Sequence, residues 1–284
     1  MFRIDLHLHT DFSDGFFPPD EVVRKSVDGA LSVIAITDHD SVGAYAVAEP
    51  VASEFGIGLI PACEISTARD GEEVHILGYF PEGYPEALFE FLAGVRADRV
   101  TRVRQGVENL RKAGIDIAYD EVVAAASGEI LSRAHIGRLI VERGYAKSLH
   151  SAFGKYLMPA HGLVPVSRRS PGEVLDFFSG YGAISAWAHP EPKVFDRFLK
   201  DFIDRGLCGI ETVNRRRIDP DASRYFEQAA AEHDLFVTRG SDWHGYGRAT
   251  EITGFEVSLE TCRSFLERFP KYVDVSLLEK NETE

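Results

Sequence analysis

The sequence is poor in cysteine. Cys63, Cys208 and Cys262 are the only three among 284 residues, and they are widely spaced among apolar neighbours. An odd, scattered set of this kind favours reduced core residues over a disulfide framework or thiol catalysis. We therefore assign no chemistry to cysteine.

Positive charge is also scarce. The 31 lysines and arginines are outnumbered by 45 aspartates and glutamates, which gives a formal net charge of −14. A surface with this balance repels long polyanions, so the sequence argues against extended, nonspecific binding of nucleic acid. A small anionic substrate stays compatible with the sequence wherever a local positive centre outweighs the overall charge.

Long hydrophobic runs are lacking as well. The longest, 31–37 and 183–188, are far shorter than a membrane span, and the N-terminus lacks the basic-then-apolar build of a signal peptide. We therefore predict a cytoplasmic protein that does not bind membranes. With 44% hydrophobic residues, the chain can still fill a sizeable core, as one large domain or as a domain with an insertion.

Short apolar runs typical of buried strands recur along the chain, and several are followed by a helical pattern. The predicted strands are 3–9, 32–37, 58–63, 73–79, 183–188, 208–213 and 235–238. The predicted helices among them are 19–30, 42–55, 194–205 and 220–233. This alternation indicates an α/β fold built on a parallel sheet or barrel.

The middle of the chain breaks this alternation. From about residue 84 to 165 the pattern is nearly all helical, and Gly114, Gly128 and Gly144 mark the loops. The predicted helices here are 85–113, 120–126, 133–143 and 148–157. We therefore predict a helical insertion subdomain, 85–165, within a main domain formed by 1–84 and 166–284.

Residues able to bind metal stand at the ends of the predicted strands. Side chains alternate along the first strand of FRIDLHLHTDFSDG, so His7 and His9 point the same way, close enough to bind one ion. Packing alone explains one such pair equally well, but similar residues recur along the chain. They are Asp38, His39, Glu64, His189, Asp242 and His244 at strand ends, and His75 within its run.

These residues are expected to meet in one pocket, because the C-terminal strand ends of a β/α barrel converge on one face. Imidazoles with carboxylates and without cysteine suit zinc, manganese or iron. The set is too rich in nitrogen for calcium or magnesium alone. The sequence therefore predicts a transition-metal site.

The ordered motifs resemble those of a known family. DLHLHTDFSDG, ITDHDSVGA, the PACEIS segment, HILGYF, AHP and GSDWHG are similar to the motifs of the polymerase and histidinol phosphatase (PHP) family of metal-dependent phosphoesterases. They span residues 5–245. The resemblance implies a distorted (β/α)7 barrel that holds two or three divalent ions, here expected to be manganese, zinc or iron.

The resemblance also implies three sets of metal ligands, two of which share a glutamate. The first set is His7, His9, Glu64 and Asp242. The second is Glu64, His75 and His189, and the third is Asp14, His39 and His244. Every position is filled by a residue able to ligate, which argues against a degenerate copy of the site. Three carboxylates against three divalent ions leave a local charge of about +3, which can hold a phosphate dianion.

The expected reaction is in-line attack on phosphorus by a hydroxide held between two ions, without a covalent enzyme intermediate. His189 and Asp38 are candidates for donating a proton to the leaving group. In the plainer interpretation the carboxylate of Asp38 only orients a histidine ligand, and Asp5 is a further candidate for that role.

The insertion narrows the resemblance to one subgroup. SRAHIGRLIVERG, FGKYL and VPVSRRSPGEVL resemble members that act on 3′,5′-bisphosphonucleotides or on short RNA. Arg133 and His135 match positions that face the active site in such relatives, and a planar guanidinium suits a phosphate dianion. Lys155 and Asn214 are further candidates for substrate contacts. The alternative for each is an ordinary surface residue.

The resulting prediction is a metal-dependent phosphoesterase that removes the 3′-phosphate from a 3′,5′-bisphosphonucleotide such as 3′-phosphoadenosine 5′-phosphate. The predicted partner is thus a small phosphorylated nucleotide or a short oligonucleotide. Alternatives are a 5′-3′ exoribonuclease on short RNA, a histidinol-phosphate phosphatase, and a noncatalytic module that binds metal for stability. The insertion disfavours histidinol phosphate, and the complete ligand set disfavours the noncatalytic module.

Overall fold

Eight strands form one sheet in the part of the chain that the computed structural model describes, residues 1–128, 130–214, 220–247 and 250–283. The order across the sheet is β7-β6-β5-β4-β3-β2-β1-β8. The strands are β1 (Phe2–Leu8), β2 (Val33–Ile36), β3 (Gly58–Arg69), β4 (Glu72–Tyr79), β5 (Ile184–Ala188), β6 (Gly209–Asn214), β7 (Phe236–Gly240) and β8 (Phe255–Val257). The first seven therefore neighbour one another in chain order.

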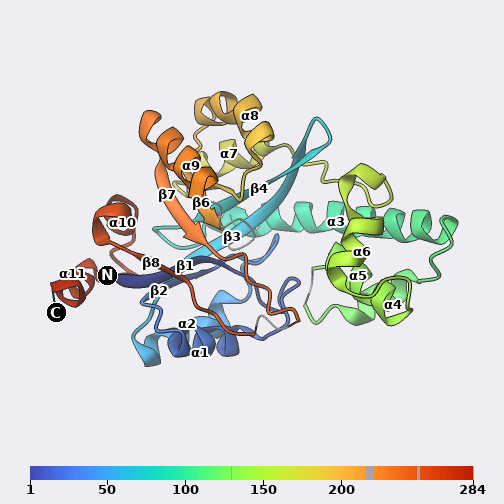
Figure 1. The fold of residues 1–284 in the computed structure, drawn as a ribbon, viewed down its shortest axis with the longest axis horizontal. Coiled ribbons are helices and arrows are strands. Elements are labelled where there is room, and N and C mark those ends of the chain that lie inside the picture. The colour runs from blue at the N-terminus through green and yellow to red at the C-terminus, as the bar shows by residue number, and fades with distance from the viewer. Residues whose placement is uncertain (129, 215–219, 248–249, 284) are drawn as a thin grey trace.

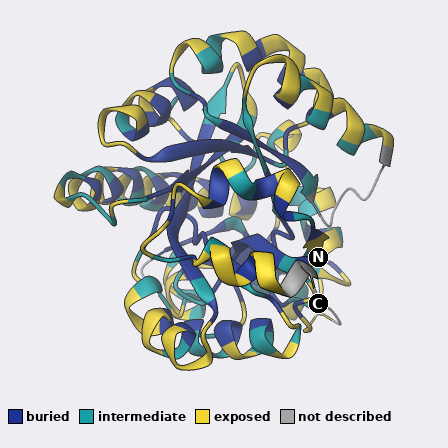
Figure 2. Cartoon of the chain, turned by 90° about the vertical axis from the view of Figure 1, so that its left-hand side faces the viewer, coloured by how far each residue is buried: buried dark blue, intermediate teal, exposed yellow. Residues whose placement is uncertain are grey.

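Helices cover the outside of this sheet (Figure 1). They are α1 (Pro19–Asp28), α2 (Tyr45–Phe55), α7 (Pro171–Gly180), α8 (Pro192–Asp204), α9 (Pro220–Glu232), α10 (Leu259–Leu266) and α11 (Val275–Thr283). The strands are mostly buried, whereas the helices alternate buried and exposed residues (Figure 2). Among the described residues, no helix combines the length and the apolar character needed to cross a bilayer.

The sheet curls until the end of β7 reaches β1. Ser241 N donates to Asp5 Oδ1 at 2.8 Å, and His9 N donates to the carbonyl of Trp243 at 2.9 Å. Gly240 permits this approach, because a Cβ there would lie 2.2 Å from the Cβ of His7. The result is the nearly closed α/β barrel that the sequence predicts. Strand β8 was not predicted, since three residues are too short to show a strand pattern; it pairs antiparallel with β1.

The hairpin of β3 and β4 departs from a parallel barrel. β4 runs antiparallel to both β3 and β5. The prediction ended β3 at residue 63, but β3 continues to Arg69 and turns at Asp70 and Gly71, whose φ angles are 53° and 83°. Two consecutive positive φ angles are typical of a tight hairpin turn. The reversed direction brings the first half of β4 to the end of the barrel where β5 finishes.

The predicted insertion forms a helical lobe beside the barrel (Figure 1). Its elements are α3 (Glu86–Lys112), α4 (Tyr119–Ala125), α5 (Arg133–Glu142), α6 (Leu149–Ala152), a π-helix (Phe153–Leu157) and a 3₁₀-helix (Pro159–His161). The single helix predicted over 148–157 is thus divided into α6 and the π-helix.

Helix α3 belongs to two hydrophobic cores. Leu88 and Val95 pack with the barrel, whereas Val103 and Leu110 pack with α4 and α5 in a separate core. Because one continuous helix carries both contacts, the lobe is anchored to the barrel along a rigid rod. The separate core supports the division of the chain into 1–84 with 166–284 and 85–165, which stays a prediction.

Candidate metal centre

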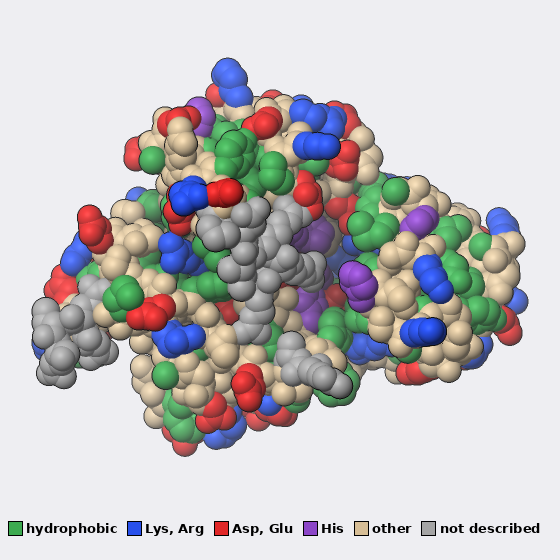
Figure 3. Space-filling view, in the orientation of Figure 1, with side chains coloured by type: hydrophobic (Ala, Val, Ile, Leu, Met, Phe, Trp, Pro, Cys, Tyr) green, Lys and Arg blue, Asp and Glu red, His purple; other side chains and the backbone are tan. Residues whose placement is uncertain are grey.

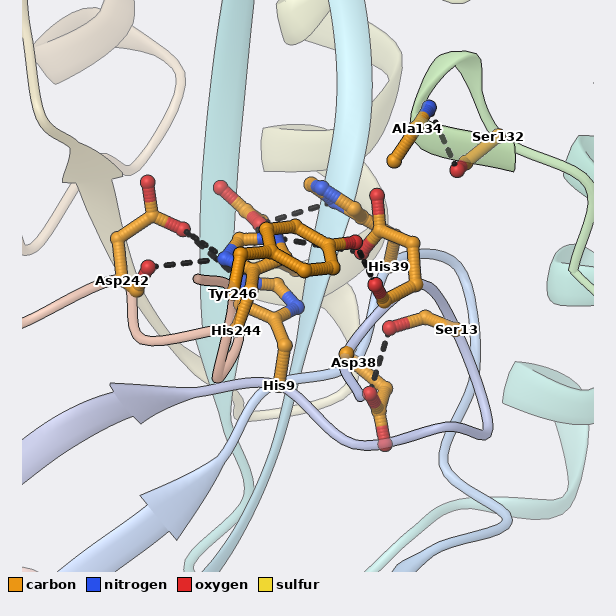
Figure 4. Close-up of polar contacts among 12 residues, drawn as sticks. His9, Ser13, Asp38, His39, Ser132, Ala134, Asp242, His244 and Tyr246 are labelled. Atoms are coloured by element: carbon orange, nitrogen blue, oxygen red, sulfur yellow. Dashed lines mark hydrogen bonds and ion pairs between the residues drawn. The ribbon is translucent and has the colours of Figure 1, made fainter. Parts of the chain in front are cut away.

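The side chains of all nine predicted ligands lie close together at one end of the barrel. In the close-up, His9, His39, Asp242 and His244 lie next to one another (Figure 4). Three groups have ligand atoms that all lie within 4.8 Å of one another: His7, His9, Glu64 and Asp242; His39, Glu64 and His75; and His9, Asp14, His39 and His244. His189 joins the second group through Glu64, at 3.2 Å.

Glu64 is the centre of the cluster. Its Oε2 lies 3.3 Å from the Nε2 atoms of both His7 and His9 and 2.9 Å from His39 Nδ1. Its Oε1 lies 2.9 Å from His75 Nδ1. Burial opposes its charge, but His39 and the other surrounding imidazoles hold the pKa of Glu64 well below its usual range. One carboxylate thus faces two groups of nitrogen donors, which is the arrangement of a bridging ligand.

His75 reaches this cluster because of the reversed strand. It pairs with Ser66 on β3 and with Ala188 on β5, directly before His189. An antiparallel β4 places its early residues where the parallel strands have their ends. This explains why His75 lies within its apolar run, while its companions follow theirs.

The third group is held partly by the insertion. His244 Nε2 lies 3.2 Å from Asp14 Oδ1, and the ring of His244 stacks on that of His9 at 4.1 Å. Arg138 of α5 donates to the backbone carbonyl of Asp14 at 2.8 Å and to the hydroxyl of Tyr246 at 3.0 Å. The Tyr246 hydroxyl itself donates to the same carbonyl. A helix of the insertion therefore fixes the loop that carries Asp14.

The donor atoms fit divalent cations. Asp14 Oδ1, His39 Nδ1 and Glu64 Oε2 are buried and make no hydrogen bond within the described part of the chain. Atoms that bind one ion at about 2.1 Å lie about 3 Å apart, as these atoms and their neighbours do. Burial opposes the charge of His9, yet Asp242 and Glu64 raise its pKa to about 9. Protons thus neutralise the carboxylates here, and a bound metal would displace them.

Glu211 contacts two of the candidate ligands, and the sequence analysis did not identify it. Its carboxylate accepts hydrogen bonds from His7 Nδ1 at 2.9 Å and from the backbone N–H of His189 at 2.9 Å. It therefore sets the ring of one candidate ligand and the backbone of another, while lowering the expected positive charge by one. A glutamate inside the apolar strand GIETVN was the available signal, and it matches the setting of Glu64 in PACEIS.

Asp5 and Asp38 hold backbone and loop groups. Asp5 accepts from the backbone N–H groups of His7 and Ser241, and burial raises its pKa to about 6. Asp38 accepts from Thr10 N at 2.7 Å and from the Thr10 hydroxyl. It also accepts from the hydroxyl of Ser13 (Figure 4). Since both Asp38 oxygens are occupied by this loop, the geometry favours a positioning role over proton donation.

Two candidate ligands have unusual backbones. His189 and Asp242 have φ angles of 34° and 52°, in the left-handed region. Such a conformation costs a residue with a side chain about 1–2 kcal/mol. Both residues directly follow strand ends, where the turn directs their side chains back toward the cluster. The fold thus accepts local strain to bring these groups into place.

A cavity of about 470 Å³ separates the cluster from the insertion. Histidine side chains are visible in the hollow between the barrel and the helical lobe (Figure 3). The barrel contributes Asp14, His39, Ser66, Glu73, His75, His244 and Tyr246 to its lining. The insertion contributes polar residues at one part, including Arg99, Arg102 and Arg133, and apolar residues such as Leu149, Phe153 and Met158. This volume suits a small-molecule ligand of nucleotide size.

Of the residues predicted to contact the substrate, Arg133 and His135 lie in different surroundings. Arg133 lines the cavity, where its guanidinium donates to Glu73 at 2.7 Å and to the carbonyl of Leu157 at 3.3 Å. His135 is buried, its Nδ1 accepts from the backbone N–H of Ser132, and burial lowers its pKa to about 4.

Lys155 and Asn214 are the remaining predicted substrate contacts. His135 and Lys155 are not among the lining residues, and Lys155 is exposed on the π-helix. Asn214 is the last residue of β6, and its side chain lies outside the described part of the chain. The prediction for Arg133 is compatible with the geometry, and those for His135, Lys155 and Asn214 stay predictions.

The sequence analysis did not identify Arg99 and Arg102, which line the cavity. Arg99 donates to Asp40 at 2.6 Å and to the Ser66 hydroxyl at 2.7 Å, and Arg102 donates to Asp98 at 2.8 Å. They lie in the segment RADRVTRVR, where arginines recur with no pattern that separates a cavity residue from a surface one.

Comparisons with known proteins agree with this geometry. The family model described as PHP domain matches residues 5–157. The 3′,5′-nucleoside bisphosphate phosphatase of Chromobacterium violaceum is 31% identical over 93% of this chain and 95% of its own. The 5′-3′ exoribonuclease Rnm of Salmonella typhimurium is 32% identical over 84% of each chain.

A solved structure is similar throughout. The crystal structure of a metal-dependent phosphoesterase from Bifidobacterium adolescentis has a TM-score of 0.83 and 29% identity, and the match covers 95% of this chain and 96% of that one. The barrel and the helical lobe therefore recur together in a protein of the same size.

Proposed function

Since the chain belongs to the PHP domain family and is a metal-dependent phosphoesterase, we propose that it hydrolyses the 3′-phosphoester of 3′,5′-bisphosphonucleotides. The name of the Chromobacterium violaceum relative supports this substrate class. The observation that carries the proposal is the cavity, because residues of the donor cluster line it from the barrel and arginines line it from the insertion. A substrate with two phosphate groups can interact with both walls.

The nine clustered residues are proposed to hold two or three divalent ions of manganese, zinc or iron. When bound, such ions neutralise the phosphoryl oxygens and the leaving oxygen and activate water. Glu64 keeps two donor groups at a fixed separation, and Glu211 keeps His7 in one ring orientation. The buried setting of these carboxylates strengthens every charge interaction with the substrate.

His189 is proposed either as a ligand or as the proton donor to the leaving 3′-oxygen. Its Nε2 lies 3.2 Å from Glu64, and about a quarter of its side chain is exposed, at 23%. The same nitrogen cannot serve both roles at once, because a ligating nitrogen has no proton to give. Asp38 is not proposed as the proton donor, because its oxygens accept hydrogen bonds from the loop of Thr10 and Ser13.

A second candidate function is stepwise 5′-3′ hydrolysis of short RNA, as the name of the Salmonella typhimurium relative indicates. A 5′-phosphorylated nucleotide joined through its 3′-oxygen presents the same two phosphate groups as a bisphosphonucleotide. The 3′-oxygen of that nucleotide is the leaving group in both reactions, which differ in the phosphoryl group attacked, since in RNA this group also carries the rest of the chain. The chain's formal net charge of −14 favours short substrates over long ones.

The test is an activity screen on protein reconstituted with manganese, zinc or iron(II), which follows inorganic phosphate for the phosphomonoesters and nucleoside 5′-monophosphate for RNA. The substrates are a 3′,5′-bisphosphonucleotide, nucleoside 3′- and 5′-monophosphates, histidinol phosphate and short 5′-phosphorylated RNA. We expect the highest kcat/KM for the bisphosphonucleotide. A preference for histidinol phosphate would overturn the proposal, and a fully loaded protein without turnover on any substrate would favour the noncatalytic module.

A further inference from the structure

We propose that a buried ion pair between Arg99 of α3 and Asp40 of the barrel positions His39 for binding a metal ion. Arg99 is then a positioning residue, and the insertion supports a second candidate ligand in addition to Asp14. The inference rests on the proposed metal centre, but it does not depend on which phosphoester the protein hydrolyses.

The segment that carries His39 is paired with the segment that carries Glu64. His39 and Glu64 form a parallel bridge beyond the end of β2. The backbone N–H of Asp40 donates to the carbonyl of Glu64 at 2.8 Å. Asp40 Oδ1 accepts from the backbone N–H of Ser66 at 3.0 Å. Asp40 therefore fixes the backbone beside two candidate ligands.

Arg99 completes this arrangement from the insertion. Its Nε and Nη2 lie 2.6 and 2.5 Å from Asp40 Oδ2, and Nη2 also donates to the Ser66 hydroxyl at 2.7 Å. Its Nη1 donates to the carbonyl of Leu131 at 3.3 Å, directly before the start of α5. One guanidinium thus joins both ligand-bearing segments to the helical lobe.

Stability alone does not explain this ion pair. Asp40 is fully buried and Arg99 is 7% exposed, and taking two charges out of water is costly enough that an apolar pair can stabilise a fold equally well. An apolar pair cannot direct hydrogen bonds to the backbone, however. The φ angle of Asp40 is 53°, in the left-handed region, so its side chain and backbone are held in one uncommon conformation. This specificity is what a metal ligand requires of its neighbour.

The geometry predicts which ions depend on the pair. His39 contributes to two of the three groups of donor atoms, those that include His75 and His244. The group that includes His7 and Asp242 is formed by other residues. Loss of the pair should therefore weaken the binding of ions that His39 holds and spare the ion of the remaining group. A general loss of folding would weaken all of them alike.

The test is a manganese titration of the wild type and Arg99→Gln, in which paramagnetic resonance measures free manganese. At least one bound ion in the variant should have a dissociation constant about 10- to 100-fold higher, as when a group that orients a ligand is lost. At least one other ion should keep its affinity within about threefold, because its ligands are held by other groups. Unchanged binding, or equal weakening of every ion, would overturn the inference.

A double variant separates positioning from folding. Asp40→Asn retains a residue that tolerates the left-handed backbone, but it leaves the buried charge of Arg99 unpaired, so the melting temperature should fall. Asp40→Asn combined with Arg99→Met removes both charges and should recover most of the melting temperature. The manganese affinity should stay low, because His39 is still unsupported. Recovery of both properties would show that the pair is only structural and would overturn the inference.

Two further variants test the chemistry of the side chain. Arg99→Lys keeps the charge without the planar fork, so it should recover part of the affinity that Arg99→Gln loses. Arg69→Gln breaks a different ion pair, between β3 and Asp201 of α8, and neither partner adjoins a candidate ligand in the sequence. It should change the manganese affinity by less than about twofold. A loss as large as that of Arg99→Gln would contradict the proposed role.

Failure of the proposed function would give a different result. If Arg99→Gln shows the expected loss and the wild type hydrolyses no bisphosphonucleotide, the substrate assignment fails while the role of Arg99 stands. If the wild type hydrolyses the substrate and Arg99→Gln binds manganese normally, the inference fails while the function stands. A wild type that binds neither manganese, zinc nor iron would overturn the metal centre and this inference together.

Discussion

The two walls of the cavity satisfy their charges in opposite ways. On the barrel wall, Glu64 and Asp14 have buried oxygens without hydrogen bonds among the described residues, and Asp242 and Glu64 raise the pKa of His9 against the effect of burial. On the insertion wall, Arg99 and Arg133 are paired with carboxylates, and Arg102 retains an unused donor. The barrel wall therefore needs several cations to balance its carboxylates. The insertion wall has an unused donor for only one anion. Catalysis should depend on many residues jointly, and substrate choice on few.

The largest effect should come from removing the shared bridge. Glu64→Gln replaces the carboxylate that faces five imidazoles with a neutral amide, so activity should fall by at least about 10³-fold, as when a central catalytic group is lost. Chelation of the wild type should have the same effect, with recovery on adding manganese. Metal content by elemental analysis checks the cause. A fully active, metal-free protein would contradict the account of the barrel wall.

A smaller loss should follow from Glu211→Gln, which keeps the shape of the side chain but weakens its hydrogen bonds to His7 and His189. Groups that orient a ligand typically contribute about 10- to 100-fold to metal affinity. Metal titration should show weaker binding, and high manganese should restore much of kcat. If added manganese does not restore the activity of the variant, Glu211 does not act by orienting the metal ligands.

Arg138 tests whether the walls are coupled. Arg138→Ala removes donors to the carbonyl of Asp14 and to Tyr246, which should cost about 2–3 kcal/mol of unfolding free energy. The rise in melting temperature on adding manganese should also shrink, because a displaced Asp14 binds metal less well. Arg143→Ala, an exposed arginine of the same lobe, is the control. An unchanged response to manganese would show that the insertion does not support the metal site.

The smallest expected effect is on the pH dependence of folding stability, and it comes from His135 in the insertion. His135 has a pKa near 4 in the folded protein against about 6.5 unfolded, so folding favours its neutral form. The stability that this neutral form contributes is complete above about pH 6.5 and is lost as the pH falls toward 4. The loss at pH 5 is about 1–2 kcal/mol. Relative to the wild type, His135→Asn should therefore lose less stability between pH 7.5 and pH 5 in denaturant titrations. Identical pH dependence would contradict this placement.

The clustering of residues on the barrel wall could be predicted from the sequence, for a physical reason. Residues at the ends of parallel strands must meet, so His7, His9, His39 and His189 could be grouped from position alone. The same rule misjudged β3, which was predicted to end at Cys63 but continues because it pairs with an antiparallel β4. Glu64 nevertheless lies in the cluster, since it is the first residue of the extension.

The insertion wall could not be predicted in the same way. Helix α3 carries arginines at many positions, and their roles depend on which turn of the helix crosses from the barrel core to the insertion core. Arg102 and Arg104 are two residues apart, yet the first is buried at the cavity and the second is exposed. Likewise, a carboxylate such as Glu73 neutralises Arg133 across two chain segments. Contacts of this kind arise only from tertiary packing.

The most direct test of the account is the identity of the product formed from a nucleoside 3′,5′-bisphosphate by the manganese-loaded protein. If the barrel wall holds the reacting 3′-phosphate and the insertion wall holds the 5′-phosphate, the products are the nucleoside 5′-monophosphate and inorganic phosphate. Phosphorus magnetic resonance distinguishes the two monophosphates directly. Formation of the nucleoside 3′-monophosphate, or no turnover in a protein shown to be fully loaded, would contradict it.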